Sequence, residues 1–142
     1  MTDKDIVKKY LGVPFKHQGR SIEEGLDCWG LIRAIYADHG ITLFDLESYE
    51  VDWAKVGKNY FLEHYADQWE RVDQPNFMDV ALFQTSPSVV NHAGLVLNNS
   101  KFIHASKAGI VVSRLGELQI FKRLAGFYRL KNDNHKIPSQ QI

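Results

Sequence analysis

The residues of this chain that could carry covalent chemistry are its only cysteine, Cys28, and two histidines, His92 and His104. A cysteine thiolate is a strong nucleophile, and a nearby histidine can take the thiol proton as a general base. A second histidine bonded to the first would hold that ring in the orientation that accepts the proton. We therefore expect Cys28 to be the nucleophile, His92 the base and His104 the residue that orients His92.

Other interpretations of these three residues remain open at this point. Free cysteine is among the most buried residue types, so Cys28 is also typical of an inert core residue. A single histidine in a strand is often only structural. A metal site built from all three side chains is a further alternative, but a closed zinc site needs a fourth protein ligand, and no C-x-x-C or H-x-x-x-H pair supplies one. We expect no metal and no cofactor.

A helix that begins at Cys28 must position the sulfur. Asp27 is a good N-cap and His39-Gly40 a good stop. Between them, apolar residues recur with helical spacing, at Cys28, Leu31, Ile32, Ile35 and Tyr36. In the first helical turn the unpaired N–H groups favour a thiolate, whereas the Asp27 carboxylate opposes one. A nucleophilic cysteine therefore needs a histidine from elsewhere in the chain.

A hairpin with its loop at residues 98–100 must bring the two histidines together. A two-residue loop would pair His92 with Ala105 and turn the imidazoles to opposite faces. A three-residue loop pairs Gly94 with His104 and puts both imidazoles on one face, with their Cβ atoms about 7 Å apart. Gly94 opposite His104 also leaves room for a side chain. The triad requires the three-residue register or an equivalent bulge.

The rest of the chain predicts helices first and strands after them. Thr2 and Asp5 resemble a capping box for a helix over residues 3–10, and aromatic spacing predicts another helix over residues 58–69. Short apolar runs between turn residues predict an antiparallel meander, at residues 80–83, 93–97, 101–105, 109–112 and 125–130. This order of elements predicts an α+β fold.

Composition limits the classes of function. The chain has 142 residues, which favours one domain over residues 1–130 followed by a polar, loose tail over residues 131–142. Its 17 basic and 17 acidic residues balance, so we expect neither a nucleic-acid nor a membrane partner. The first residues are polar and no apolar run has the length of a signal or membrane segment, which predicts synthesis in the cytoplasm.

Several motifs follow one another along the chain, at residues 11–15, Gly19, residues 25–31, 78–79, 91–97 and 102–106. Together they closely resemble the ordered motifs of NlpC/P60 cysteine peptidases, over roughly residues 5–130. A D-C-x-G-L motif alone is a weak signal. The resemblance becomes specific because H-x-G follows that motif and a second φ-H-A histidine comes twelve residues after the first.

The resemblance implies a papain-like fold, in which a helix carrying the cysteine packs on an antiparallel sheet carrying the histidines. It implies hydrolysis of amide bonds in peptidoglycan stem peptides, typically between D-glutamate and the diamino acid, through a thioester. Cys28, His92 and His104 match the family's nucleophile, base and third polar residue, and the Cys28 N–H would contribute to the oxyanion hole. Residues 14–20 and the missing signal peptide look more like phage-tail and prophage members, which predicts phage tail proteins as partners and the virion as a location.

The sequence departs from the family's pattern at two positions beside the nucleophile. Phe15 stands where most secreted members have Tyr, and His17 or Gln18 would then supply the oxyanion donor. Trp29 stands where most members have Ser, and its ring would narrow or reshape the substrate groove. With Asp27, these residues complete the predicted substrate and oxyanion site.

Two other functions remain open. The chain could be a tail or assembly component that keeps the fold and binds its partner without hydrolysis. It could also turn the same residues on a cytoplasmic amide, ester or thioester. Retention of Cys28, His92 and His104 together disfavours a pure scaffold, because a scaffold needs none of them.

Overall fold

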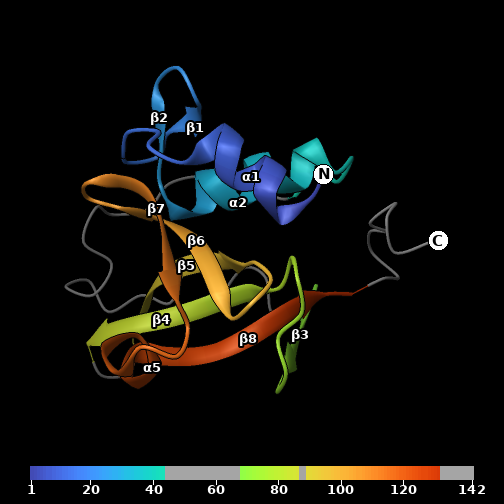
Figure 1. Ribbon diagram of the computed structural model, residues 1–142, viewed down its shortest axis with the longest axis vertical. Coiled ribbons are helices and arrows are strands. Elements are labelled where there is room, and N and C mark those ends of the chain that lie inside the picture. The colour runs from blue at the N-terminus through green and yellow to red at the C-terminus, as the bar shows by residue number, and fades with distance from the viewer. Residues whose placement is uncertain (44–67, 87–88, 132–142) are drawn as a thin grey trace.

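The computed structural model describes residues 1–43, 68–86 and 89–131 (Figure 1). In these ranges the helices are α1 (Asp3–Tyr10), α2 (Cys28–Asp38) and α5 (Leu118–Arg123), and the strands are β1 (Arg20–Ser21), β2 (Gly25–Leu26), β3 (Trp69–Val72), β4 (Val80–Ser86), β5 (Val89–Val96), β6 (Lys101–Ser106), β7 (Gly109–Arg114) and β8 (Leu124–Leu130). Within the described ranges, no helix has the length and apolar character needed to span a bilayer. The fold is α+β, as predicted.

The two helices at the start of the chain begin and end where their caps predict. Thr2 and Asp5 form the capping box of α1, with side chain and backbone bonded in both directions. Asp27 caps α2 by accepting a hydrogen bond from the Gly30 N–H at 2.8 Å. His39 is the C-cap of α2. Local cap chemistry therefore determines where the helix that carries Cys28 begins.

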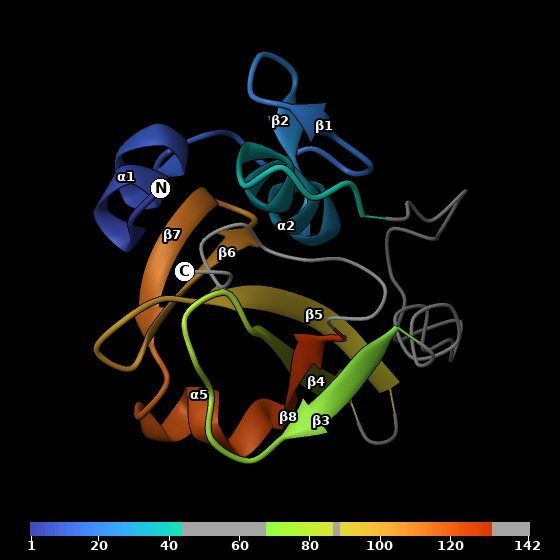
Figure 2. The same ribbon diagram turned by 90° about the vertical axis from the view of Figure 1, so that its right-hand side faces the viewer.

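The main sheet has six strands in the order β3-β8-β4-β5-β6-β7, and all its neighbours are antiparallel. Strands β4 to β7 form the predicted meander. The prediction is wrong for β8, which does not extend the meander beyond β7. Instead, α5 carries the chain back so that β8 lies between β3 and β4. Figures 1 and 2 show α5 at the end of the molecule opposite α1 and α2.

The helix predicted for residues 58–69 mostly lies outside the described residues. Its last residue, Trp69, is described, and it begins strand β3 and pairs with Leu130 of β8. The prediction is therefore wrong for Trp69, because pairing with a distant strand outweighs the helical spacing of aromatic residues. The predicted tail also lies outside the described residues, except for Lys131.

Side chains on the two faces of the sheet enter two hydrophobic clusters. Leu95 and Ile103 belong to the larger cluster, which also contains the buried residues of α1 and α2. Val96 and Phe102, one position along in the sequence, belong to the smaller cluster on the other face, next to α5. The alternation follows from the two-residue repeat of a strand. Helix α2 therefore lies on the sheet through the same strands that carry the histidines.

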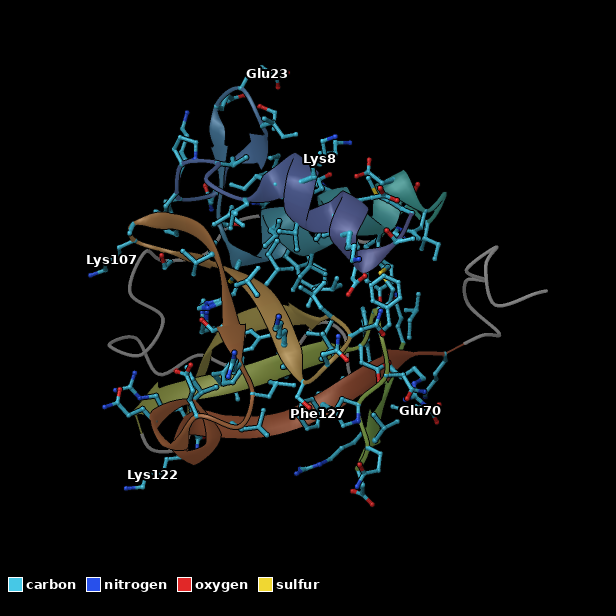
Figure 3. All side chains as sticks on the ribbon, in the orientation of Figure 1. Lys8, Glu23, Glu70, Lys107, Lys122 and Phe127 are labelled. Carbon is cyan, nitrogen blue, oxygen red and sulfur yellow. The ribbon has the colours of Figure 1, made fainter. Side chains whose placement is uncertain are left out.

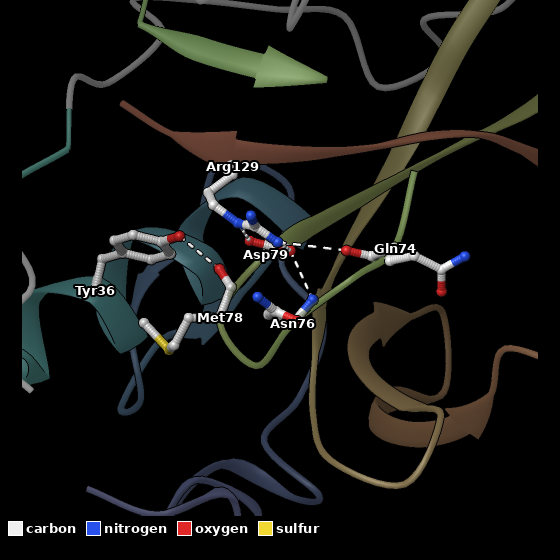
Figure 4. Close-up of polar contacts among 6 residues, drawn as sticks. All are labelled: Tyr36, Gln74, Asn76, Met78, Asp79 and Arg129. Carbon is white, nitrogen blue, oxygen red and sulfur yellow. Dashed lines mark hydrogen bonds and ion pairs between the residues drawn. The ribbon is translucent and has the colours of Figure 1, made fainter. Parts of the chain in front are cut away.

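A polar cluster ties the other end of α2 to the sheet (Figure 4). The Tyr36 hydroxyl donates a hydrogen bond to the Met78 carbonyl. The buried Asp79 carboxylate accepts from the Arg129 guanidinium at 2.8 and 2.9 Å and from the Asn76 N–H at 2.7 Å. Because Arg129 lies on β8 and Asp79 precedes β4, these bonds hold α2 and two strands in one arrangement.

The connection between α1 and α2 is a small hairpin, which the sequence pattern did not predict. Strands β1 and β2 pair through Arg20 with Leu26, and Glu23 at the hairpin tip points outward (Figure 3). Gly30 of α2 lies against the carbonyl oxygen of Gly19, and a Cβ on either glycine would clash with backbone. The glycines therefore allow the hairpin to approach the start of α2 closely.

Candidate active site

The cysteine lies in the first turn of α2, next to the strand that carries His92. Cys28 is 7% exposed and contributes to the main hydrophobic cluster. Its sulfur is close enough to the backbone N–H groups of Ala93 and Trp29 for both to favour the thiolate. Ala93 directly follows His92 on β5, so the sulfur lies beside the backbone of the strand that carries the predicted base.

Asp27 connects the helix that carries Cys28 to the preceding hairpin. Its Oδ1 accepts hydrogen bonds from the Gly30 N–H and from Arg20 Nη1, both at 2.8 Å. Its Oδ2 accepts from the Gln18 N–H at 2.9 Å. The carboxylate is buried, and the ion pair with Arg20 offsets part of the cost of burying its charge. Asp27 is therefore placed to hold the backbone on both sides of the nucleophile.

The electrostatic surroundings keep the sulfur protonated at rest. Burial, followed by the nearby Asp27 charge, raises the pKa of the Cys28 thiol to about 12. The N–H groups of Ala93 and Trp29 and the Arg20 charge act in the opposite direction. The helix terminus is therefore not sufficient to form a thiolate, and a base has to remove the proton.

The two histidines meet in the register that the chemistry requires. Gly94 pairs with His104, and the Leu97 N–H donates to the Lys101 carbonyl at 2.7 Å across the three-residue loop. His92 Nε2 and His104 Nδ1 are 2.8 Å apart, and the rings meet edge to face. Of the two registers that the sequence left open, the structure has the three-residue one, which the triad requires. A Cβ on Gly94 would lie 2.7 Å from the Phe102 ring and 3.2 Å from His104 Cβ, which explains the glycine.

Aromatic side chains enclose the imidazole pair and keep it neutral. Phe102 stacks on His104 with ring centroids 4.5 Å apart, and Phe83 lies 5.9 Å from His92. Burial, and next the neighbouring His104, lowers the pKa of His92 to about 3. Burial also lowers the pKa of His104 to about 4. At neutral pH both rings are uncharged, and each has one nitrogen able to accept a proton.

The structure adds a serine that sequence reasoning missed. His104 Nε2 lies 2.9 Å from Oγ of Ser113 on β7, so the hydrogen-bond chain has a third member. The turn at Lys107 pairs Ser106 with Gly109, and this register puts Ser113 diagonally beside His104. Counting residues from that turn along both strands would have predicted the contact between Ser113 and His104. Serine as a residue type gave no signal.

The remaining predicted residues lie near the start of α2 in different environments. Phe15 is 38% exposed and forms an isolated bridge with Leu26. His17 is half-buried and Gln18 is exposed, in the loop that Asp27 holds. Trp29 is 2% exposed and packs in the main cluster. The ring of Trp29 therefore influences the site through packing of the helix, which does not favour the predicted contact with substrate.

The geometry of the ring pair also bears on the metal alternative. The 2.8 Å between His92 Nε2 and His104 Nδ1 is a direct hydrogen bond, and it uses the two nitrogens that an ion held between the rings would need. Zinc–nitrogen bonds of about 2.0–2.1 Å in tetrahedral geometry would separate these atoms further. Across residues 1–43, 68–86 and 89–131, no group of three metal-binding side chains is found.

Chemically, these side chains are of the types that couple proton transfer to nucleophilic attack. A thiol lies at a helix N-terminus, where backbone N–H groups can stabilise a developing oxyanion. A neutral imidazole on the adjacent strand is bonded through Nε2, which leaves Nδ1 as its other nitrogen. These are the parts needed for acyl transfer to sulfur.

Known proteins share this sequence pattern and fold. The model of the NlpC/P60 family matches residues 12–129. Gamma-DL-glutamyl hydrolase from Bacillus subtilis (strain 168) is 30% identical over 137 residues, covering 94% of this chain and 29% of that protein. Tail tip assembly protein K of Escherichia phage N15 is 32% identical over 85 residues, covering 55% of this chain and 34% of that protein. The chain thus spans about a third of the length of these relatives.

A solved structure shares the fold. The NLP/P60 family protein from Staphylococcus aureus subsp. aureus Mu50, described as similar to lipoprotein, matches with a TM-score of 0.68 and 23% identity. The match covers 91% of this chain and 40% of that chain. The structural match shows the shared fold, and the family match over residues 12–129 establishes that the chain belongs to the NlpC/P60 family.

Proposed function

We propose that this chain is a cysteine amidohydrolase that cleaves γ-D-glutamyl amide bonds in peptidoglycan stem peptides. Cys28 is the nucleophile, His92 the general base and His104 the residue that orients His92. The observation that carries the proposal is the hydrogen bond between His92 and His104. His92 lies on β5 directly before Ala93, whose backbone N–H faces the Cys28 sulfur. A domain that only packs does not need a half-buried pair of bonded imidazoles at this position.

In the proposed reaction the neutral thiol and neutral imidazole react together. As Cys28 Sγ attacks the amide carbon, its proton passes to His92 Nδ1, and the oxyanion forms against the Cys28 N–H. The C–N bond then breaks, and the amine leaves with the proton from His92. Water hydrolyses the thioester, which releases the carboxylic acid product and regenerates the thiol. Hydrogen bonds between a nucleophile and its base often become short only when substrate is bound, and we expect this of the bond between the Cys28 thiol and His92 Nδ1.

The type of bond is suggested by the relative from Bacillus subtilis, whose name describes a hydrolase of γ-DL-glutamyl bonds. A stem peptide contains a γ-linked D-glutamyl residue, so the two substrates share one bond chemistry. The sequence resemblance to peptidoglycan peptidases points to the same substrate.

The experiment treats purified peptidoglycan with the wild-type protein and identifies the released fragments by mass spectrometry. We expect fragments that end at D-glutamate, and none with Cys28→Ala. Lys122→Ala, on α5 at the far end of the molecule, is the matched control and should cleave like the wild type (Figure 3). Cleavage by the Cys28→Ala protein would refute the assignment of the nucleophile.

A second candidate function is a part in phage tail assembly without hydrolysis. The similarity to Tail tip assembly protein K favours it, because that protein's name describes assembly. Intact peptidoglycan after treatment with wild-type protein, together with binding to a tail protein that Cys28→Ala leaves unchanged, would favour this candidate over the enzyme.

A further inference from the structure

The hydrogen-bond chain that begins at His92 does not end at His104. It continues from His104 Nε2 to Oγ of Ser113, at 2.9 Å. Ser113 lies on β7, and the β6–β7 register puts it on the same face as His104 and the stacked Phe102 ring. The chain therefore runs across three neighbouring strands, from β5 through β6 to β7 (Figure 1).

The direction of each hydrogen bond follows from what His92 must do. A neutral imidazole carries one N–H, and only its bare nitrogen can accept a proton. If His92 Nδ1 accepts the thiol proton, the N–H is on Nε2 and donates to His104 Nδ1. His104 then carries its own N–H on Nε2, and that N–H needs an acceptor, which is Ser113 Oγ.

The opposite set of directions disables the base. If His104 Nδ1 carried the N–H, it would donate to His92 Nε2, and His92 would carry its proton on Nδ1. That nitrogen then has no lone pair for the thiol proton. The tautomer of His104 therefore sets the tautomer of His92, and the group bonded to His104 Nε2 influences both.

We propose that Ser113 is a positioning residue that accepts a hydrogen bond from His104 Nε2–H and so keeps Nδ1 of His92 free to act as base. This inference rests on the proposed function and adds a residue to the same site. A hydroxyl oxygen suits the role because it can both accept this bond and donate its own hydrogen elsewhere.

Two variants of nearly equal shape separate the effect of the hydroxyl oxygen at position 113 from the effect of side-chain volume. Ser113→Thr keeps the hydroxyl, Ser113→Val replaces it with a methyl group, and both β-branched residues suit a strand. Ser106→Ala is the matched control, because Ser106 lies in the same hairpin and its hydroxyl bonds the Gly109 carbonyl instead of an imidazole.

The first readout is the tautomeric state of His92 and His104 in the resting protein, by long-range ¹H–¹⁵N NMR at neutral pH. We expect both rings to carry hydrogen on Nε2 in the wild type, Ser113→Thr and Ser106→Ala. In Ser113→Val the Nδ1–H tautomer of both rings should become populated. If the Ser113→Val protein folds poorly, Ser113→Ala takes its place in the measurement. A wild-type His104 protonated on Nδ1, or a Ser113→Val protein with wild-type tautomers, would overturn the proposal.

The second readout is hydrolysis. Ser113→Val should lower kcat by about 10- to 100-fold, the range typical when the hydrogen-bond partner that orients a metal-bound histidine is removed. We expect KM to be unchanged and Ser113→Thr to be close to wild type. Equal kcat in the Val and Thr variants would also overturn the role. Failure of the proposed function looks different, because the wild type would then not hydrolyse peptidoglycan while the NMR result still tests Ser113.

Discussion

At the scale of single residues, the Cys28 thiol is too weak an acid and the His92 imidazole too weak a base for the proton to pass between them at rest. Burial raises the pKa of Cys28 and lowers that of His92. Charge separation then has to occur during attack, when the helix N-terminus and the bonded His104 can stabilise the two new charges. We therefore expect native Cys28 to react slowly with iodoacetamide below neutral pH.

Replacing Asp27 with asparagine should make the thiol more reactive. The neutral side chain still caps α2, but the negative charge that raises the pKa of Cys28 is removed. The rate of alkylation at pH 8, followed by intact mass, should rise by about three- to fourfold for each unit by which the pKa falls, because the thiolate fraction increases while the nucleophilicity of the thiolate decreases. Glu24→Gln is the control, because it removes an exposed acid from the same hairpin. Equal rates in both variants would contradict this electrostatic role.

The sequence predicts some of these residue contacts and not others. His92 and His104 could be paired because a loop length sets the register, and the register sets the face. The charge state of Cys28 could not be predicted, since it depends on burial and on Arg20, which reaches Asp27 from seven positions away. Ser113 was missed because its role comes from its position and not its residue type.

At the scale of elements, the contact between the first hairpin and α2 depends on glycine. Gly30 faces the Gly19 carbonyl, and Gly19 in turn faces the Gly25 carbonyl. This close approach lets the Gln18 N–H and Arg20 reach the Asp27 carboxylate. The hairpin and the helix are therefore positioned as one unit around the nucleophile.

Gly30→Ala should destabilise the protein despite the higher helix propensity of alanine. The gain in propensity is about 1 kcal/mol, but the new Cβ would overlap a backbone oxygen that only a shift of the hairpin could move away. We expect the free energy of unfolding in urea to fall by about 1–3 kcal/mol. Gly116→Ala is the control, since a Cβ there has nothing within 4 Å. The same stability for the two variants would show that the contact is looser than described.

Elements with strong local signals were the ones that the sequence predicted. The capping box of α1 and the N-cap of α2 act within a few residues, so their positions could be inferred directly. The position of β8 depends on pairing with β3 and β4, which lie far away in the chain. Apolar runs identify strands but do not specify their partners, and this explains the error in the meander.

At the scale of the whole molecule, the half-buried histidines of the site link stability to pH. The pKa values of His92 and His104 are lowered to about 3 and 4 in the folded protein, from 6.5 for the unperturbed group. Between pH 6.5 and 4 the unfolded chain therefore binds more protons than the folded protein. The unfolding free energy should fall as the pH falls through this range, by at most about 1.4 kcal/mol per pH unit for each histidine.

Carboxylates also titrate near pH 4, but they do so alike in the wild type and in the His104→Gln variant. The difference between these two proteins therefore isolates the contribution of the histidine to the pH dependence of stability. Urea unfolding from pH 7 to pH 4 should give a smaller slope of free energy against pH in the variant than in the wild type. Parallel slopes would mean that the folded protein accommodates a charged imidazole at this position.

The central claim is that Cys28 attacks and His92 takes its proton. The most direct test measures the initial rate of hydrolysis of a γ-D-glutamyl stem peptide by wild type, Cys28→Ala and His92→Gln, each first shown to unfold cooperatively. The account predicts turnover by the wild type, none by Cys28→Ala, and a loss of about 100-fold or more in kcat for His92→Gln. A wild-type rate in either variant would contradict it.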